Sequence, residues 1–143
     1  MKQKLRKDNS LAIECEKWKD KLEAGCYPYA LKIPINKFCL IGEFIGNPCT
    51  GITPDEELIE TLKKEIEEIF EYKLIETDRE TIPVDNQFKV ILVRDFHSGY
   101  YHFYRQNSNG VLTDKIPGEL PMLATEREIF VGNKQIWLFL VTK

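Results

Sequence analysis

Two histidines and four cysteines are the residues of this sequence best suited to nucleophilic chemistry. His102 lies in the aromatic stretch GYYHFYRQNSNG, which covers residues 99–110. A histidine that is oriented by a carboxylate takes a proton from a thiol and later returns it to a leaving group. A cysteine hydrolase site therefore needs both a thiol and a carboxylate close to His102.

The turn after His102 decides which carboxylate can face it. A three-residue loop, Ser108-Asn109-Gly110, with glycine in the left-handed conformation forms a type I turn plus a bulge. In that register Tyr104 pairs with Asp114, and His102 and Asp114 share one face, about 7–8 Å apart at the backbone. A two-residue Asn-Gly turn would put them on opposite faces. We favour the three-residue loop, with Asp95 as the alternative carboxylate.

Cys26 has the best position for a nucleophile. It starts the short apolar segment CYPYALKI, in which Pro28 is tolerated within the first turn of a helix. A helix N-terminus favours a thiolate and supplies backbone N–H groups for an oxyanion. The other three cysteines are expected in a helix core or in an irregular segment: Cys15, Cys39 and Cys49.

Each candidate also has a purely structural interpretation. His102 can pack among the strand aromatics, Cys26 can act as a small buried hydrophobe, and Asp114 can be a solvated residue near a turn. His97, in the loop 96–99, is expected to be exposed rather than to serve as the base. No Cys-x-x-Cys or His-x-x-x-His spacing supports zinc, so we expect neither a metal site nor a cofactor.

Helical patterns dominate the first half of the chain. Apolar residues at helical spacing predict an amphipathic helix over 10–23, and a second, short helix is expected from Cys26. Residues 34–52 contain three glycines and two prolines and are expected to be irregular. A capping box at residues 53–56 predicts a helix that runs to about Tyr72 and turns its charged face to solvent.

Strand patterns dominate the second half. The β-rich runs are KLIET (73–77), FKVILVRDF (88–96), YYHFYRQ (100–106), GVLTDKI (110–116), REIFVG (127–132) and QIWLFLVT (135–142). Helices followed by strands predict an α+β fold, with the N-terminal helices packed on one mostly antiparallel sheet. The length of 143 residues fits a single domain, 1–143.

Composition and charge exclude several classes of partner. The chain has 20 basic and 23 acidic residues and a net charge of −3, which argues against nucleic-acid binding. No apolar run is long enough for a secretory signal or a membrane span, so we expect a cytoplasmic protein with free thiols and no membrane contact.

Three segments resemble a family of small bacterial and phage proteins: Cys26–Leu31, Tyr101–Gly110 and Leu112–Gly118. The family has an Asn-Cys-Tyr-x-Tyr-Ala-Leu opening and a Tyr-His-Phe-Tyr-Arg-x-Asp-x-x-Gly-x-Trp-Ser-His-Lys-Pro-Gly hairpin. Its Cys–His arrangement looks like that of papain-like hydrolases of the NlpC type. The resemblance implies a papain-like fold with Cys26 as nucleophile, His102 as base and Asp114 as the orienting residue. It also implies backbone N–H groups near Cys26 as part of an oxyanion hole.

The resemblance implies a cysteine hydrolase of peptidase or amidase type, which cleaves a peptide or small amide through a thioester at Cys26. The chain departs from the family pattern at four positions: Gly25 replaces Asn, Leu112 replaces Trp, Asp114 replaces His, and Ile116 is an extra residue. The three substitutions at Gly25, Leu112 and Asp114 motivate an alternative function on the same fold, a non-catalytic, phage- or toxin-associated interaction protein that binds a host protein.

Overall fold

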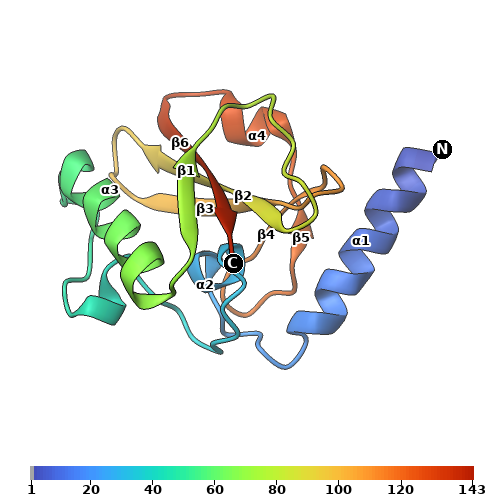
Figure 1. The fold of residues 1–143 in the computed structure, drawn as a ribbon, viewed down its shortest axis with the longest axis horizontal. Coiled ribbons are helices and arrows are strands. Elements are labelled where there is room, and N and C mark those ends of the chain that lie inside the picture. The colour runs from blue at the N-terminus through green and yellow to red at the C-terminus, as the bar shows by residue number, and fades with distance from the viewer. Residues whose placement is uncertain (1) are drawn as a thin grey trace.

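The fold centres on one six-stranded antiparallel sheet with the strand order β1-β6-β2-β3-β4-β5 (Figure 1). The computed structural model describes the backbone of residues 2–143 and the side chains of residues 9–143. The strands are β1 (Lys73–Glu76), β2 (Gln87–Asp95), β3 (Tyr101–Gln106), β4 (Leu112–Asp114), β5 (Met122–Leu123) and β6 (Lys134–Thr142). Helices combined with one antiparallel sheet confirm the predicted α+β class.

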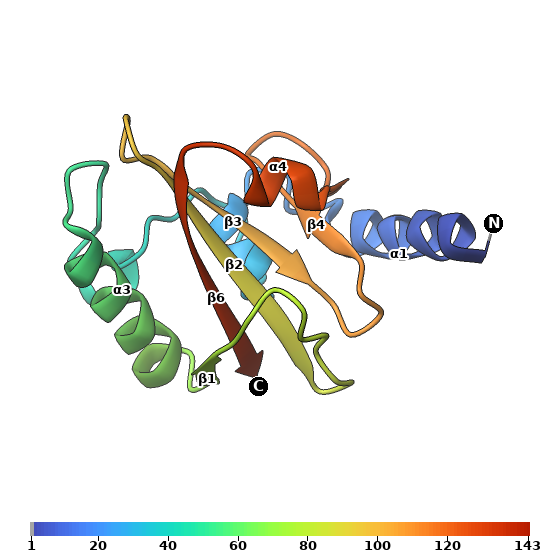
Figure 2. The same ribbon diagram turned by 90° about the horizontal axis from the view of Figure 1, so that it is seen from above.

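Within residues 2–143, four helices lie around this sheet. They are α1 (Lys2–Trp18), α2 (Cys26–Ala30), α3 (Asp55–Lys64) and α4 (Glu126–Phe130), with a 3₁₀ turn at Glu43–Ile45 and a π turn at Glu65–Ile69. Figure 2 shows α1 projecting from the side of the sheet opposite α3. The short helix α2 packs against β3 and β4.

The central strand β2 is buried on both faces because its apolar residues point alternately to two cores. Phe88, Val90 and Leu92 join the larger core, which also contains Tyr27 of α2 and Leu58 of α3. Ile91 and Val93 join a smaller core that α4 covers through Ile129. The helix that carries Cys26 therefore packs on the larger core.

The first helix differs from its prediction in both position and buried face. The helix α1 starts and ends earlier than the predicted range 10–23, and Leu22 lies beyond it with 40% of its surface exposed. The buried side chains of α1 include Glu14 and Trp18, whereas Cys15 is only half-buried. The apolar spacing was misleading because a buried ion pair, described below, draws Glu14 inward.

The predicted capping box at residues 53–56 is wrong. The N-cap position of α3 is Pro54, with no side-chain cap, and Thr53 Oγ1 instead accepts a hydrogen bond from the Thr50 N–H at 2.9 Å. The α-helix ends at Lys64, and the π turn completes the helical segment before Tyr72. The Thr53 hydroxyl therefore closes a local turn that precedes the helix, and it does not cap the helix.

The predicted strand over 127–132 is also wrong, because this segment starts as α4. Thr125 accepts a hydrogen bond from the Glu128 N–H at 3.2 Å, and Glu128 accepts one from the Thr125 N–H at 2.6 Å. This reciprocal capping box fixes the helix start. The predicted strand over 110–116 is shortened to β4.

Candidate functional site

The hairpin that joins β3 and β4 has the predicted three-residue loop. Arg105 pairs with Thr113, and the Asn107 N–H donates to the Val111 carbonyl at 3.2 Å. Gly110 has a φ of +84°, the left-handed conformation that the bulge requires. The predicted register is thus confirmed.

This register brings His102 and Asp114 together. His102 Nε2 and Asp114 Oδ2 are 2.8 Å apart, with 28% of the histidine side chain and 12% of the aspartate side chain exposed. The alternative carboxylate, Asp95, is exposed and accepts hydrogen bonds from the N–H groups of His97 and Ser98. His97 is exposed in that loop. Asp114, and not Asp95, is therefore the carboxylate that contacts the His102 ring.

Cys26 lies at the start of α2, as predicted, and is half-buried. Burial by itself lowers the pKa of His102, but the Asp114 hydrogen bond and the proximity of Cys26 outweigh it and raise the pKa to about 10. Because Nε2 is hydrogen-bonded to Asp114, Nδ1 is the ring nitrogen that can exchange a proton with the Cys26 thiol. No Cys26–His102 contact among residues 9–143 meets full hydrogen-bond geometry, as is common in a cysteine–histidine pair without substrate.

The two tyrosines of the CYPYA helix anchor Cys26. The Tyr27 hydroxyl donates to Glu65 Oε1 at 2.6 Å, and its ring stacks on Phe103 of β3 with centroids 4.9 Å apart. The Tyr29 hydroxyl donates to Glu14 Oε1 at 3.0 Å and lies 2.7 Å from Thr113 Oγ1 of β4. The alternation Tyr-x-Tyr thus ties the helix to the same two strands that carry His102 and Asp114.

Glu65 is a fully buried carboxylate that organises the loop beside α2. Its Oε1 also accepts from the Gly42 N–H, and its Oε2 accepts from the Phe44 N–H, both at 2.9 Å. Burial raises the pKa of Tyr27 well above its ordinary value, and the neighbouring Glu65 adds to this effect. Tyr27 therefore remains a neutral hydrogen-bond donor to Glu65 throughout the physiological pH range.

Glu14 holds the other tyrosine through a buried ion pair. Arg105 donates to both of its oxygens, at 2.9 Å and 3.3 Å, and the guanidinium lies 4.2 Å from the centre of the Tyr29 ring. Burial by itself raises the pKa of Glu14, but the charge and hydrogen bonds of Arg105 outweigh it, so the pKa is lowered. The pair links α1 and β3 with the middle of α2.

The segment after β4 positions the residues immediately before Cys26. Lys115 is fully buried and donates to the carbonyls of Leu22 and Ala24 at 2.8 Å and 2.6 Å. A Cβ placed on Gly25 would lie 3.1 Å from the Phe38 ring and 3.7 Å from Pro117. Gly25 therefore lies beside the segment that follows β4.

The first turn of α2 contains two backbone donors without an acceptor in the described chain. Pro28 has no N–H, and neither the Cys26 N–H nor the Tyr27 N–H donates to another residue of the described chain. One donor belongs to Cys26, the predicted nucleophile, and the other belongs to the next residue, Tyr27. They are available to a developing negative charge on a substrate oxygen.

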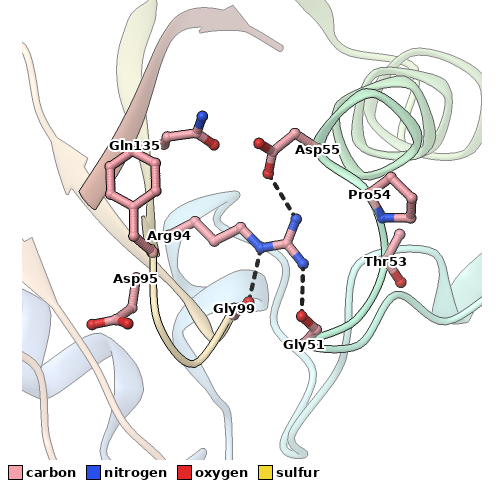
Figure 3. A pocket seen from close by; sticks show the side chains of 9 residues that line it. Gly51, Thr53, Pro54, Asp55, Arg94, Asp95, Gly99 and Gln135 are labelled. Carbon is pink, nitrogen blue, oxygen red and sulfur yellow. Dashed lines mark hydrogen bonds and ion pairs between the residues drawn. The ribbon is translucent and has the colours of Figure 1, made fainter. Parts of the chain in front are cut away.

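A separate hollow beside the start of α3 contains none of the three predicted site residues. It encloses about 270 Å³ and surrounds Arg94, whose guanidinium donates to Asp55, Gly51 and Gly99 (Figure 3). Its carboxylate and carbonyl partners already satisfy the arginine. We interpret it as a structural link between α3 and two loops.

Comparison of the chain with protein-family models, curated proteins and solved structures finds no match in any of the three. Within residues 2–143 no helix is long and apolar enough to cross a membrane. Across the described side chains, no three His, Cys, Asp or Glu residues are grouped so that they can hold a metal ion. The geometry of the site is therefore the main basis for assigning a function.

Sequence reasoning missed the residues that support the site: Glu14, Glu65, Arg105 and Lys115. All four are charged residues buried to at least 96%. One local signal was present for Glu14, since it lies between Leu11 and Trp18 on the helical face that was predicted to be apolar. Glu65, Arg105 and Lys115 gave no such signal, because charged side chains are expected at the surface.

Proposed function

We propose that this chain is a small papain-like cysteine hydrolase, with Cys26 as the nucleophile, His102 as the base and Asp114 as the orienting residue. The observation that carries the proposal is the His102–Asp114 hydrogen bond of 2.8 Å, combined with the Cys26 thiol beside the same ring. The assembly links a helix start with two strands of an antiparallel sheet. This is the arrangement that the NlpC-type resemblance implies.

The reaction follows from these positions. Because the pKa of His102 is raised to about 10, Nδ1 already holds the Cys26 thiol proton at neutral pH. The Cys26 thiolate attacks the carbonyl carbon of an amide, and the carbonyl oxygen becomes an oxyanion beside the Cys26 and Tyr27 N–H groups. His102 then protonates the leaving amine, and the C–N bond breaks to give a thioester. A water molecule that loses its proton to His102 attacks the thioester, and the carboxylic acid and free thiol are released.

Asp114 keeps the ring in the orientation that this sequence of steps requires. Its carboxylate accepts the Nε2 proton, which stabilises the imidazolium that forms when Nδ1 takes the thiol proton. The substitution of aspartate for the family histidine is compatible with this role, since both side chains can accept a hydrogen bond. The substrate class that we propose is a peptide or a small amide.

Selective alkylation tests the proposal. Iodoacetamide at pH 6.5 should label Cys26 faster than the other thiols, because burial raises the pKa of Cys15, Cys39 and Cys49. A His102→Ala variant should lose the fast reaction, whereas a His97→Ala variant should keep it. Equal rates for all four cysteines, or a fast Cys26 reaction that persists in His102→Ala, would reject the proposed pair. Hydrolysis of fluorogenic peptidyl amides, lost in Cys26→Ser, tests the reaction itself.

A further inference from the structure

A second hollow lies beyond the C-terminal end of α2, at the opposite end of this short helix from Cys26. It encloses about 240 Å³ between α1, the segment after α2, β3 and the end of β6. Its lining contains five cationic residues: Lys17, Lys21, Lys32, Arg105 and Lys143. Glu14 is the only acidic residue in the lining. We refer to this site as the lysine hollow.

The positive charge of the lysine hollow is not neutralised by the protein. Glu14 is committed to Arg105, and its oxygens also accept from the Tyr29 hydroxyl and from the Asn107 amide. Within residues 9–143, no salt bridge joins any of the four lysines to a carboxylate. The ion pair is neutral as a unit, so the lysines contribute an excess of positive charge to one small space.

An unsatisfied donor adjoins the same hollow. Arg105 is 2% exposed, and its Nε atom is buried with no hydrogen-bond partner among the described residues. A buried donor without an acceptor is uncommon in folded proteins and calls for an explanation, such as an ion that binds there. The donor and the unpaired lysines independently indicate an anion.

The backbone of Lys32 adds a further argument. Lys32 follows the end of α2 with a φ of +58°, and the Lys32 and Ile33 N–H groups donate to the Tyr29 and Pro28 carbonyls. These bonds form a Schellman motif, in which the left-handed position is normally glycine. A lysine at this position has a strained backbone conformation. What lysine adds over glycine is a positive charge, and its ammonium group lies 4.8 Å from the centre of the Phe88 ring.

We propose that the lysine hollow binds the phosphate group of a small phosphate monoester. Lysines from α1 and the turn after it, from the segment after α2 and from the end of β6 line one compact space, which suits a tetrahedral dianion contacted from several sides. The planar fork of Arg105 is already occupied by Glu14, so two-point recognition of a carboxylate by arginine is not available. The volume accommodates a phosphate with a small organic group.

The protonation of Lys32 makes this binding sensitive to pH. Burial lowers the pKa of Lys32, and the cations of Arg105, Lys143 and Lys17 lower it further to about 8, while Glu14 opposes them. A phosphate monoester is already a dianion above pH 7. Affinity should therefore fall between pH 7 and pH 9, because Lys32 loses its charge over this range.

Calorimetric titration tests the proposal on the full chain, with glycerol phosphate, inorganic phosphate and acetate at constant ionic strength. Glycerol phosphate should bind saturably and more tightly than acetate, and Lys32→Gly should weaken its binding at least tenfold. The thermal midpoint of Lys32→Gly without ligand should not fall, because glycine relieves the left-handed strain. Lys19→Gln, which removes an exposed lysine paired with Glu16, should bind like the parent.

Three outcomes would overturn the proposal: no saturable binding of glycerol phosphate, acetate binding as tight as phosphate binding, or equal weakening in Lys19→Gln and Lys32→Gly. A Lys21→Gln variant provides a second measurement that leaves the Schellman motif unchanged, and it should also weaken binding. If the Cys26 thiol of these variants reacts as fast as in the parent, their loss of phosphate binding is separate from the proposed hydrolase site.

Discussion

Replacing Asp114 with asparagine should lower the pKa of His102 while leaving the hairpin folded. The carboxylate contacts the ring at 2.8 Å, and the asparagine amide can still accept a hydrogen bond from Nε2 but carries no charge. The ordinary histidine pKa of 6.5 is raised to about 10 in this site. At 1.36 kcal/mol per pKa unit, this difference corresponds to a preference of roughly 5 kcal/mol for the protonated ring.

The contribution of Asp114 is smaller than that total. Cys26 shares the effect on the ring, and water reaches the 28% of the His102 side chain that is exposed. We assign about 2 kcal/mol to the charge of Asp114, which corresponds to a fall of about 1.5 pKa units in the variant. Because the folded pKa lies above the unfolded value, this stabilisation is complete below pH 6.5 and is lost as the pH rises through about 10.

An NMR titration of the histidine ring protons measures the change directly. A His97→Gln background leaves His102 as the only histidine, and Asp95→Asn is the matched control, because Asp95 binds backbone N–H groups of its own loop. The control should leave the pKa of His102 unchanged. A fall of less than about half a pKa unit in Asp114→Asn would refute the assignment of the orienting carboxylate. An equal fall in both variants would refute it too.

Three further substitutions test the surroundings of the site, each by urea unfolding. Glu65→Gln should lower the free energy of unfolding by about 2–4 kcal/mol, since a buried charged acceptor of three hydrogen bonds is lost; a loss below about 1 kcal/mol would contradict this. Lys115→Met should cost about 2–3 kcal/mol and slow the alkylation of Cys26, because two carbonyls just before Cys26 lose their donor; unchanged thiol reactivity would show that the Lys115 hydrogen bonds do not position Cys26. Thr125→Ala should cost about 1 kcal/mol through the lost cap of α4 and leave that reactivity unchanged.

Local sequence signals predicted the parts of the site that depend on neighbouring residues. The left-handed Gly110 set the hairpin register, and this register alone put His102 and Asp114 on one face. The segment after Gly25 predicted a helix start at Cys26, and the strand patterns predicted most of the sheet. The capping box of Thr125 and Glu128 is equally local, but it overlaps the β-rich run 127–132, whose composition predicts a strand.

The tertiary structure decided which charged residues are buried. Glu14 and Arg105 are separated by 91 positions, and Tyr27 and Glu65 by 38, so that no periodicity within one element can reveal either contact. A carboxylate in isolation favours solvent, and it becomes a core residue only when a distant partner supplies hydrogen bonds or an opposite charge. For this protein the sequence determined the hairpin, the helix start and the candidate triad through local backbone chemistry. The buried partners that hold the CYPYA helix against β3 and β4 were decided only by folding, because their burial is favourable solely once the paired charges and hydrogen bonds have come together.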